Sequence, residues 1–378
     1  MRFPEFAEEW ETKKLGEILE FKNGINATKE QYGSGYKFIN VLDILNNEFI
    51  THDKIIGSVN VNEEIIDKFP VNYGDILFQR SSETREEVGT TSVYLDKDKT
   101  ATFGGFVIRG KKNGEYEPIF LNKSLKTDLV RNQITSKSGG STRYNIGQEI
   151  LASVTLYFPS LNEQTKIASF LSLIDSRIQT QNKIIEQLET LIKGLSEKLF
   201  SQEIRFKEFT DKWELKKLGD ISTITTGSSN REDSMLNGEY TFFDRSQDIR
   251  TSSRFLFDKE AVIVPGEGQE FIPKYFIGKF DLHQRTYAIF DFSGIYGKYL
   301  YYHLLNDDKY LQSQAVGSTV KSLRLPMLQS MPIKSPCLDE QTTIANFLSV
   351  IETKIQTEKN ILDKYHSQKQ YLLQNLFI

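Results

Sequence analysis

The chain is an internal duplication, and this feature limits its fold more than any other. Residues 2–24 return at 205–227 with 12 of 23 positions identical. A second block that begins at Pro159 returns at Pro336, so the offset between the copies falls from 203 to 177. The ends of the two copies therefore match, whereas the interior of the second copy is 26 residues shorter. Two similar frames around different interiors predict one task that is performed on two targets.

The interiors, residues 25–139 and 228–316, are expected to be β-rich. Short runs such as GFVIR and AVIVP are rich in β-branched and aromatic residues, and Gly, Asn and Asp separate them. One helix is expected in each interior, near residues 120–134 in the first copy and 296–307 in the second. Each interior is therefore predicted to be a compact domain of mixed strands and a few helices, and the expected fold class of the chain is α+β.

Each copy ends in a long proline-free segment with the pattern of a coiled-coil helix. Asn162 and Asp339 are expected to cap helices that run to Phe200 and Phe377. A seam position recurs every three or four residues and is apolar at nine of ten places in the first copy and eight of ten in the second. The seam positions are Ile167, Leu171, Ile174, Ile178, Gln181, Ile185, Leu188, Ile192, Leu195 and Leu199, and their equivalents Ile344, Leu348, Ile351, Ile355, Glu358, Leu362, Tyr365, Lys369, Leu372 and Leu376.

The two helices are predicted to pack antiparallel. The second interior leaves the end of the first helix and must return to the start of the second, and a parallel pair would separate these points by ~57 Å at about 1.5 Å per residue. The two β-rich domains are then expected at opposite ends of a rod, in a pseudo-twofold arrangement. Gln181 and Glu358 lie at the middle of their helices and should face each other as a polar layer that fixes the register. The predicted divisions are two β-rich domains, 1–158 and 205–335, and two spacer helices, 159–204 and 336–378.

Composition excludes several classes of protein. A length of 378 residues predicts two or three domains. The 47 Lys and Arg residues against 51 Asp and Glu residues argue against a uniformly basic surface, but not against local basic patches. No run approaches 18 apolar residues, so no membrane span is expected. A single cysteine, Cys337, and a start without a signal peptide predict a reducing, cytoplasmic location.

No motif indicates a catalytic centre. The near P-loop at Gly105–Lys112 lacks the Ser or Thr that binds magnesium, and Pro265–Gly268 lacks the third glycine of a dinucleotide fingerprint and is interpreted as a turn. The four histidines have no paired metal-ligand spacing. We therefore expect no metal, no cofactor and no catalytic residue on this chain.

Local charge is more informative than net charge. Residues 129–148 and 309–338 contain several cations and no acid, and both include the Gly-Ser-Thr of the repeat. Hydroxyls, backbone amides and cations suit phosphate oxygens, although solvated loops are the alternative. The candidate phosphate contacts are Lys137, Ser141, Thr142, Arg143, Ser318, Thr319, Lys321 and Arg324. Further candidate DNA contacts are Arg80, Ser81, Arg85, Arg245, Arg250 and, as base-edge readers, Gln284 and Arg285, for which a structural hairpin is equally consistent.

These motifs resemble the specificity subunit of Type I restriction-modification systems. The resemblance is carried by EQTKIASFL and EQTTIANFL, by GSTRYNI and GSTVKSL, by WETKKLGEI and WELKKLGDI, and by YGDILFQRS and FDLHQRTYAIF. It covers essentially the whole chain. One departure is that the second copy has DKEAVIVPGEG in place of YGDILFQRS, so a base-reading arginine equivalent to Arg80 cannot be carried over.

The resemblance implies a non-catalytic DNA reader. Each β-rich domain would recognise one half of an asymmetric bipartite target, and the two helices would set the distance between the halves. Two methyltransferase subunits would dock, flip out an adenine in each half and methylate it, and two restriction/translocase subunits would cut unmodified DNA. S-adenosylmethionine, ATP and magnesium are therefore expected only on partner subunits.

Two other classes are kept as alternatives. A coiled-coil interaction protein with two β-rich peptide-binding domains fits the helices but leaves the basic windows without a role, and DNA binding would discriminate between the two. A self-contained restriction enzyme would need a glycine-rich cofactor loop and an Asn/Asp-Pro-Pro-aromatic segment, and neither occurs in the sequence.

Overall fold

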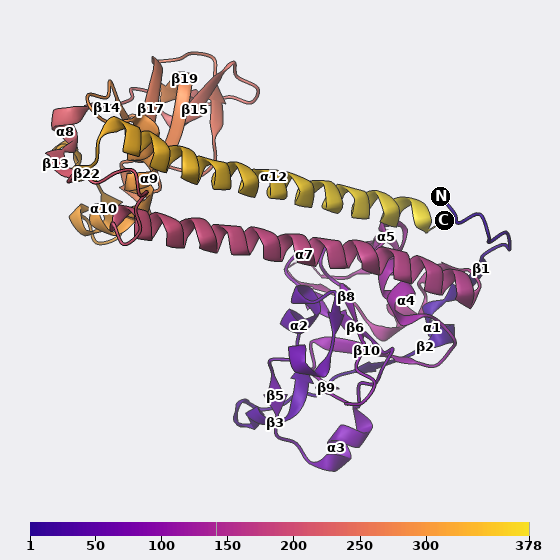
Figure 1. Ribbon diagram of the computed structural model, residues 1–378. Helices are drawn as coiled ribbons and strands as arrows, with labels where there is room; N and C mark the ends of the chain where they lie inside the picture. The colour runs from indigo at the N-terminus through magenta and orange to yellow at the C-terminus, as the bar shows by residue number, and fades with distance from the viewer. Residues whose placement is uncertain (141, 378) are drawn as a thin grey trace. The chain divides into compact units, whose positions relative to one another are not determined.

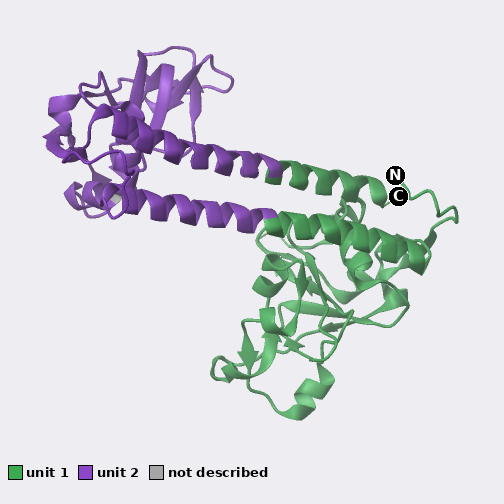
Figure 2. Ribbon diagram, viewed as in Figure 1, with its two compact units in different colours: residues 1–180, 362–378 green, residues 181–361 purple. Residues whose placement is uncertain are grey.

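The computed structural model describes residues 1–140 and 142–377, and they form two compact units. Unit 1 comprises residues 1–180 and 362–378, and unit 2 comprises residues 181–361 (Figure 2). Each unit contains one β-rich interior and parts of both long helices, α7 (Leu161–Phe200) and α12 (Leu338–Leu376). The predicted α+β class with two β-rich domains and two long helices is confirmed.

Unit 1 is built on a five-stranded sheet (Figure 1). Its strands are β1 (Glu11–Lys14), β2 (Leu19–Asn23), β3 (Tyr32–Ile39), β4 (Phe49–Ile50), β5 (Ser58–Val59), β6 (Ile76–Gln79), β7 (Ser81–Ser82), β8 (Thr91–Tyr94), β9 (Thr102–Phe103), β10 (Val107–Lys112), β11 (Tyr144–Asn145) and β12 (Thr155–Phe158). Its shorter α-helices are α1 (Leu15–Ile18), α2 (Val41–Asn46), α3 (Glu63–Lys68), α4 (Pro118–Ser124), α5 (Asp128–Lys137) and α6 (Gln148–Ala152). The main sheet has the order β2-β10-β6-β8-β4, a smaller sheet has the order β5-β3-β9, and two ladders pair β1 with β12 and β7 with β11.

Unit 2 is built on a six-stranded sheet with the order β14-β20-β17-β19-β15-β16. Its strands are β13 (Glu214–Lys217), β14 (Thr223–Thr226), β15 (Tyr240–Phe243), β16 (Arg250–Ser252), β17 (Phe257–Pro265), β18 (Glu267–Gly268), β19 (Lys274–Leu282), β20 (Thr286–Phe290), β21 (Lys321–Ser322) and β22 (Pro332–Ser335). Its shorter α-helices are α8 (Leu218–Ile221), α9 (Gly297–Asn306), α10 (Asp308–Gln314) and α11 (Leu325–Gln329). The ladders β13-β22 and β18-β21 correspond to β1-β12 and β7-β11 of unit 1. No helix among the described residues is long and apolar enough to cross a membrane.

Two helix predictions need correction. The single helix expected near residues 120–134 is two helices, α4 and α5. Helix α4 ends at Ser124, whose carbonyl oxygen accepts a hydrogen bond from the Thr127 hydroxyl (2.7 Å), and α5 begins at Asp128. The long helices begin at Leu161 and Leu338, one residue before the predicted caps Asn162 and Asp339. The caps were misplaced because a capping side chain and a polar residue of the first turn look alike in sequence.

The predicted seam between the long helices is confirmed. In unit 1 the start of α7 shares an apolar cluster with the end of α12, and Ile167 and Leu376 belong to it. In unit 2 the end of α7 and the start of α12 share another cluster, which contains Leu199 and Ile344. These two groupings are possible only if the helices pack antiparallel. Every predicted seam position is buried or half-buried.

The polar layer of the seam forms as predicted. In unit 2 the Gln181 amide donates to the Glu358 carboxylate and, over 3.1 Å, to the backbone oxygen of Glu358. Both residues are 7% exposed. Lys354, one turn earlier on α12, also bonds the carboxylate over 2.5 Å, and Lys354 and Gln181 together lower the pKa of Glu358. Sliding one helix along the other would break the two bonds from Gln181 on α7, so this layer opposes a change of register.

In each copy of the repeat, an equivalent ion pair joins the start of the copy to the long helix that follows. Arg2 bonds Glu163 and Arg205 bonds Glu340, each over 2.7 Å, and both carboxylates are buried. The glutamine that follows each glutamate donates to the carbonyl oxygen of the preceding proline, Gln164 over 2.9 Å and Gln341 over 2.8 Å. The Glu-Gln pair of the repeated motif is therefore structural. It fastens the start of each copy to the start of the following helix.

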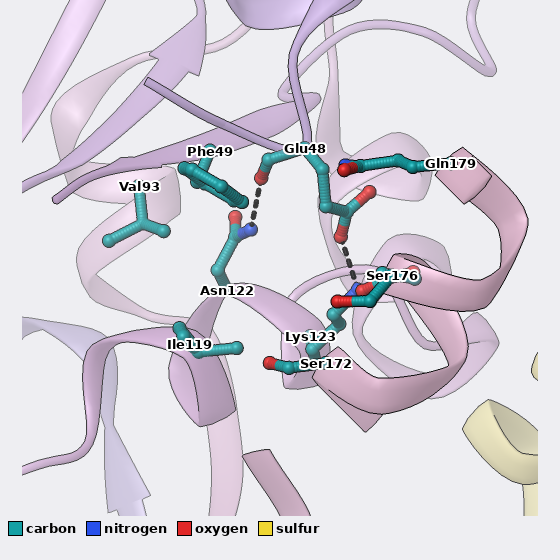
Figure 3. Close-up of a pocket in the computed structure, with 10 residues that line it drawn as sticks. Glu48, Phe49, Val93, Ile119, Asn122, Lys123, Ser172, Ser176 and Gln179 are labelled. Carbon is teal, nitrogen blue, oxygen red and sulfur yellow. Dashed lines mark hydrogen bonds and ion pairs between the residues drawn. The ribbon is translucent and has the colours of Figure 1, made fainter. Parts of the chain in front are cut away.

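Unit 1 also contains an ionic network around one buried lysine, Lys123, and Figure 3 shows its pair with Glu48. Lys123 on α4 is 1% exposed and bonds both Asp175 on α7 and Glu48, the latter over 2.5 Å. Lys126 lies 3.3 Å from Glu48, and Lys369 on α12 lies 2.8 Å from Asp175. Burial alone would raise the pKa of Glu48, but the three lysines hold it well below its usual range. Lys369, an exception to the apolar seam, is thus explained by its two carboxylate partners.

Unit 2 contains a buried histidine that should make its stability depend on pH. His303 on α9 packs against the ring of Phe200 (5.3 Å between centroids), and burial lowers the pKa of His303 to about 4. An unfolded histidine has a pKa of about 6.5, so falling pH protonates the unfolded state first. We expect this group to destabilise unit 2 by about 3 kcal/mol between pH 7 and pH 4. Urea unfolding, followed by Trp213 fluorescence in a Trp10→Phe background, measures the effect.

The His303→Leu variant should remove this pH dependence, because leucine carries no titrating group. The control is His366→Gln on the exposed face of α12, which should leave the pH dependence of unit 2 unchanged. Equal pH dependence in the wild-type protein and His303→Leu would show that other groups are responsible.

Candidate nucleic-acid interface

Both units have a turn at an equivalent place in the fold, and the last residue of each turn is exposed. The turn is residues 104–106 between β9 and β10 in unit 1, and residues 283–285 between β19 and β20 in unit 2. It begins with an equivalent hydrogen bond in each unit, from the Gly104 amide to the Ile39 oxygen (3.0 Å) and from the His283 amide to the Phe243 oxygen (2.9 Å). The two turns are therefore structural equivalents, although their sequences, GGF and HQR, share nothing.

The segment that faces each turn, which follows β6 in unit 1 and β17 in unit 2, is also equivalent in the two units. We call it the facing segment. The Arg80 amide bonds the Phe106 oxygen in unit 1, and the Gly266 amide bonds the Arg285 oxygen in unit 2, each over 2.9 Å. These bonds place Phe106 and Arg285 at one equivalent position, and Arg80 and Gly266 at another. The arginine missing from the second copy of the motif thus has a counterpart on the opposite segment. An alignment of the two copies does not show this exchange, because it compares each segment only with the equivalent segment of the other copy.

The Gly-Ser-Thr loops form the third segment. Each closes as a small hairpin, with the Gly139 amide bonding the Asn145 oxygen (3.1 Å) and the Val316 amide bonding the Ser322 oxygen (3.0 Å). Gly140 has a φ of 124°, and its equivalent Gly317 has a φ of 123°. A side chain at either position would strike the backbone oxygen three residues later, so the repeat requires glycine there.

The hairpins lie against the facing strand segments. In unit 1 β11 pairs with β7, which brings the Arg80–Arg85 segment and the Gly-Ser-Thr loop together. In unit 2 β21 pairs with β18 in the same way, and Lys321 stands opposite Gly268. The exposed turn, the facing segment and the hairpin therefore form one three-segment surface in each unit.

The predicted phosphate contacts are mostly accessible on this surface. Arg143 is 63% exposed and lies 3.8 Å from Glu83. Lys137 ends α5 and donates to the Ser153 hydroxyl (3.0 Å), and Lys321 donates to the Gln312 oxygen (3.4 Å). Exposed side chains are also found at Thr142, Ser318, Thr319 and Arg324, whereas Ser141 lies outside the described residues.

The remaining candidates in unit 1 make backbone contacts. The Arg80 guanidinium donates to the Gly105 oxygen (3.2 Å), which ties the facing segment to the exposed turn. Arg85 donates to the Thr135 oxygen (3.1 Å) and also lies over the Tyr144 ring. Ser81, half-buried, pairs with Asn145 in the ladder.

Unit 2 gathers three predicted residues in one pocket of about 230 Å³. Arg245, Gln284 and Arg285 line it, together with Arg231, Asp244, Ser246 and His283. Arg250 is not among the residues that line this pocket, and it lies 3.3 Å from the buried Asp244. The pocket is rich in hydrogen-bond donors, which suits recognition of base edges or phosphates.

The sequence analysis missed Glu267 and His283. The Glu267 carboxylate accepts hydrogen bonds from Arg285 (2.8 Å) and Arg245 (3.1 Å). The hydrogen bonds from Arg285 lower the pKa of Glu267. The ring nitrogen Nδ1 of His283 accepts from the Arg285 amide (3.0 Å), which places the ring hydrogen of the neutral form on Nε2. Burial, together with the two arginines, lowers the pKa of His283. Glu267 belongs to the PGEG segment that was interpreted only as a turn.

The family model described as the type I restriction modification DNA specificity domain matches the chain twice, over residues 7–190 and 210–364. The chain belongs to the type I restriction-modification specificity family. It is therefore a DNA specificity subunit, and such subunits work on DNA in complexes with other subunits. Specificity subunits are not catalytic, and the cofactors of these systems reside on partner subunits. The family decides against a coiled-coil protein with peptide-binding domains.

Two relatives agree with this assignment, and a solved structure shares the fold. The MjaVIII specificity subunit of a type I restriction enzyme from Methanocaldococcus jannaschii is 24% identical over 406 residues, 97% of this chain and 91% of that protein. The MjaIX specificity subunit from the same organism is 28% identical over 239 residues, which cover 58% of this chain and 53% of that protein. The type I specificity subunit from M. genitalium has the same fold, with a TM-score of 0.64 and 18% identity over 100% of this chain and 97% of that one.

Proposed function

We propose that unit 1 and unit 2 each read one half of an asymmetric, bipartite target in double-stranded DNA. The observation that supports this is the three-segment surface, which is built by equivalent backbone hydrogen bonds in both units. Different side chains occupy its equivalent positions, Phe106 against Arg285 and Arg80 against Gly266. Because base edges are read by side chains held on a fixed frame, such a pair of surfaces suits two unlike half-sites.

The proposed division assigns residues 1–158 and 205–335 to target recognition, and residues 159–204 and 336–378 to the spacer between the half-sites. Two methyltransferase subunits would dock on the duplicated frames, and two restriction/translocase subunits would join them. Each methyltransferase would flip an adenine out of one half-site and use S-adenosylmethionine, while ATP and magnesium would serve the translocases. The duplication supports two copies of each partner, and the lone Cys337 is consistent with a cytoplasmic setting.

The test is the methylome of a host without adenine methylation that expresses this chain with its methyltransferase subunit. The expected result is one motif with two unlike blocks of specified bases, a fixed unspecified gap and a modified adenine in each block. A methyltransferase that modifies the same motif without this chain would overturn the proposal.

Arg143 and Lys321 are expected to contact phosphates, because both are exposed beside the Gly-Ser-Thr loops. Arg143→Ala or Lys321→Ala should weaken binding to all DNA sequences about equally. Each should also reduce the slope of log K against log salt by ~1, since one fewer counterion is released. Fluorescence anisotropy of labelled duplexes with the methyltransferase complex, over a salt series, measures both effects.

The matched control is Lys359→Ala. Lys359 pairs with Glu189 between the long helices of unit 2 (2.7 Å) and lies on neither three-segment surface. It should leave the salt slope unchanged. A change in the methylated motif of Arg143→Ala or Lys321→Ala would contradict the assignment to phosphates.

A further inference from the structure

The arginine of the three-segment surface lies on a different segment in each unit. In unit 1 Arg80 stands on the facing segment, and Phe106, 64% exposed, stands on the turn. In unit 2 the facing segment has Gly266, where a Cβ would strike the Arg285 backbone oxygen, and the turn carries Arg285. The two equivalent turns therefore present an apolar ring in one unit and five N–H donors in the other.

Arg285 is held in one orientation by Glu267. Both carboxylate oxygens of Glu267 accept from Nη1 of Arg285, over 2.9 and 2.8 Å, and one of them also accepts from Nη1 of Arg245 (3.1 Å). Glu267 is 19% exposed, whereas the arginine side chains are 56% and 52% exposed. A shared, largely covered carboxylate offsets the repulsion between two nearby guanidinium groups. It leaves Nε and Nη2 of Arg285 available for a further acceptor.

The surroundings of Arg285 favour a base over a phosphate. Two carboxylates, Asp244 and Glu267, lie in or beside the pocket that Arg285 lines and offset much of the charge of its three arginines, so the pocket attracts a phosphate less than a cluster of cations alone would. By contrast, the basic stretch that contains Lys321 and Arg324 has no acid in its sequence. The guanine edge in the major groove offers two acceptors, O6 and N7, that match an arginine fork.

We propose that Arg285, oriented by Glu267, reads a guanine in the half-site of unit 2. Phe106 has no donor and cannot make this contact in unit 1, so the two half-sites differ at the positions read by the equivalent turns. This inference rests on the proposed function, because it requires that unit 2 contacts DNA through its three-segment surface.

The experiment is the methylome of Arg285→Ala, expressed with its methyltransferase subunit. One position of the unit 2 half-site, a guanine on one strand in the wild type, should lose about ten- to a hundred-fold of its discrimination, while the other half-site stays unchanged. Glu267→Gln should weaken discrimination at the same position, because it frees Arg285 to adopt other orientations. The control is Lys279→Ala, an exposed cation of unit 2 outside the pocket, which should leave the motif unaltered.

Different results would overturn the guanine assignment and the proposed function. Arg285→Ala that lowers methylation at every site with the same motif would overturn the guanine assignment and make Arg285 a phosphate contact. Absence of guanine from the specified positions of the unit 2 half-site would also overturn it. Failure of the wild-type chain to direct a bipartite motif would overturn the proposed function instead. Equal melting temperatures of wild type and variant establish that the variant is folded.

Discussion

Glu48→Gln is expected to lower the free energy of unfolding of unit 1 by about 3–5 kcal/mol. Three lysines converge on two carboxylates, Glu48 and Asp175, and the substitution leaves one carboxylate for three positive charges. Lys123 is 1% exposed, so its ammonium group depends on the carboxylates around it. Unfolding in urea measures the loss, with Trp10 as the reporter of unit 1 in a Trp213→Phe background.

A surface carboxylate supplies the control for this result. Glu11 pairs with Lys13 in the open (3.0 Å), and exposed pairs contribute little to stability. Glu11→Gln should therefore leave the urea midpoint nearly unchanged. Similar midpoints for Glu48→Gln and Glu11→Gln would show that the network does not hold unit 1 together.

The long helices α7 and α12 were predictable in detail, because their signal is local and occurs twice in the sequence. A seam with a strict three-and-four spacing fixes which face of each helix is buried, and the shared offset pairs Gln181 with Glu358. Chain continuity then selects the antiparallel arrangement. Lys369 broke the apolar pattern without an evident reason, since its partners, Glu48 and Asp175, lie far away in sequence.

The three-segment surface, which we propose contacts DNA, was predictable only in part. Composition alone indicated the Gly-Ser-Thr windows, because clustered cations without acids are visible in a short stretch of sequence. Strand pairing brings Ser81 to Asn145, and no local pattern encodes so distant a partner. The equivalence of Phe106 and Arg285 was hidden for a similar reason, since it appears only when the hydrogen bonds of the two sheets are compared.

Replacing residues 25–139 with the interior of another family member is expected to rewrite one half of the DNA target and leave the other half intact. The exchanged segment contains the exposed turn and the facing segment of unit 1, whereas the corresponding parts of unit 2 stay in place. The donor should carry a carboxylate at position 48 and a lysine at position 123, because Asp175 and Lys369 remain in the recipient. In unit 2 the equivalent of Asp175 is Glu352, which accepts a hydrogen bond from the Tyr302 hydroxyl (2.6 Å), whereas Asp175 pairs with Lys123 in unit 1.

The methylome of cells that carry this exchanged chain with its methyltransferase tests the central claim, that two independent readers share one frame. The predicted motif keeps the gap and one block of the wild-type motif and carries a new second block. A motif in which both blocks change, or a continuous palindromic motif, would contradict the account.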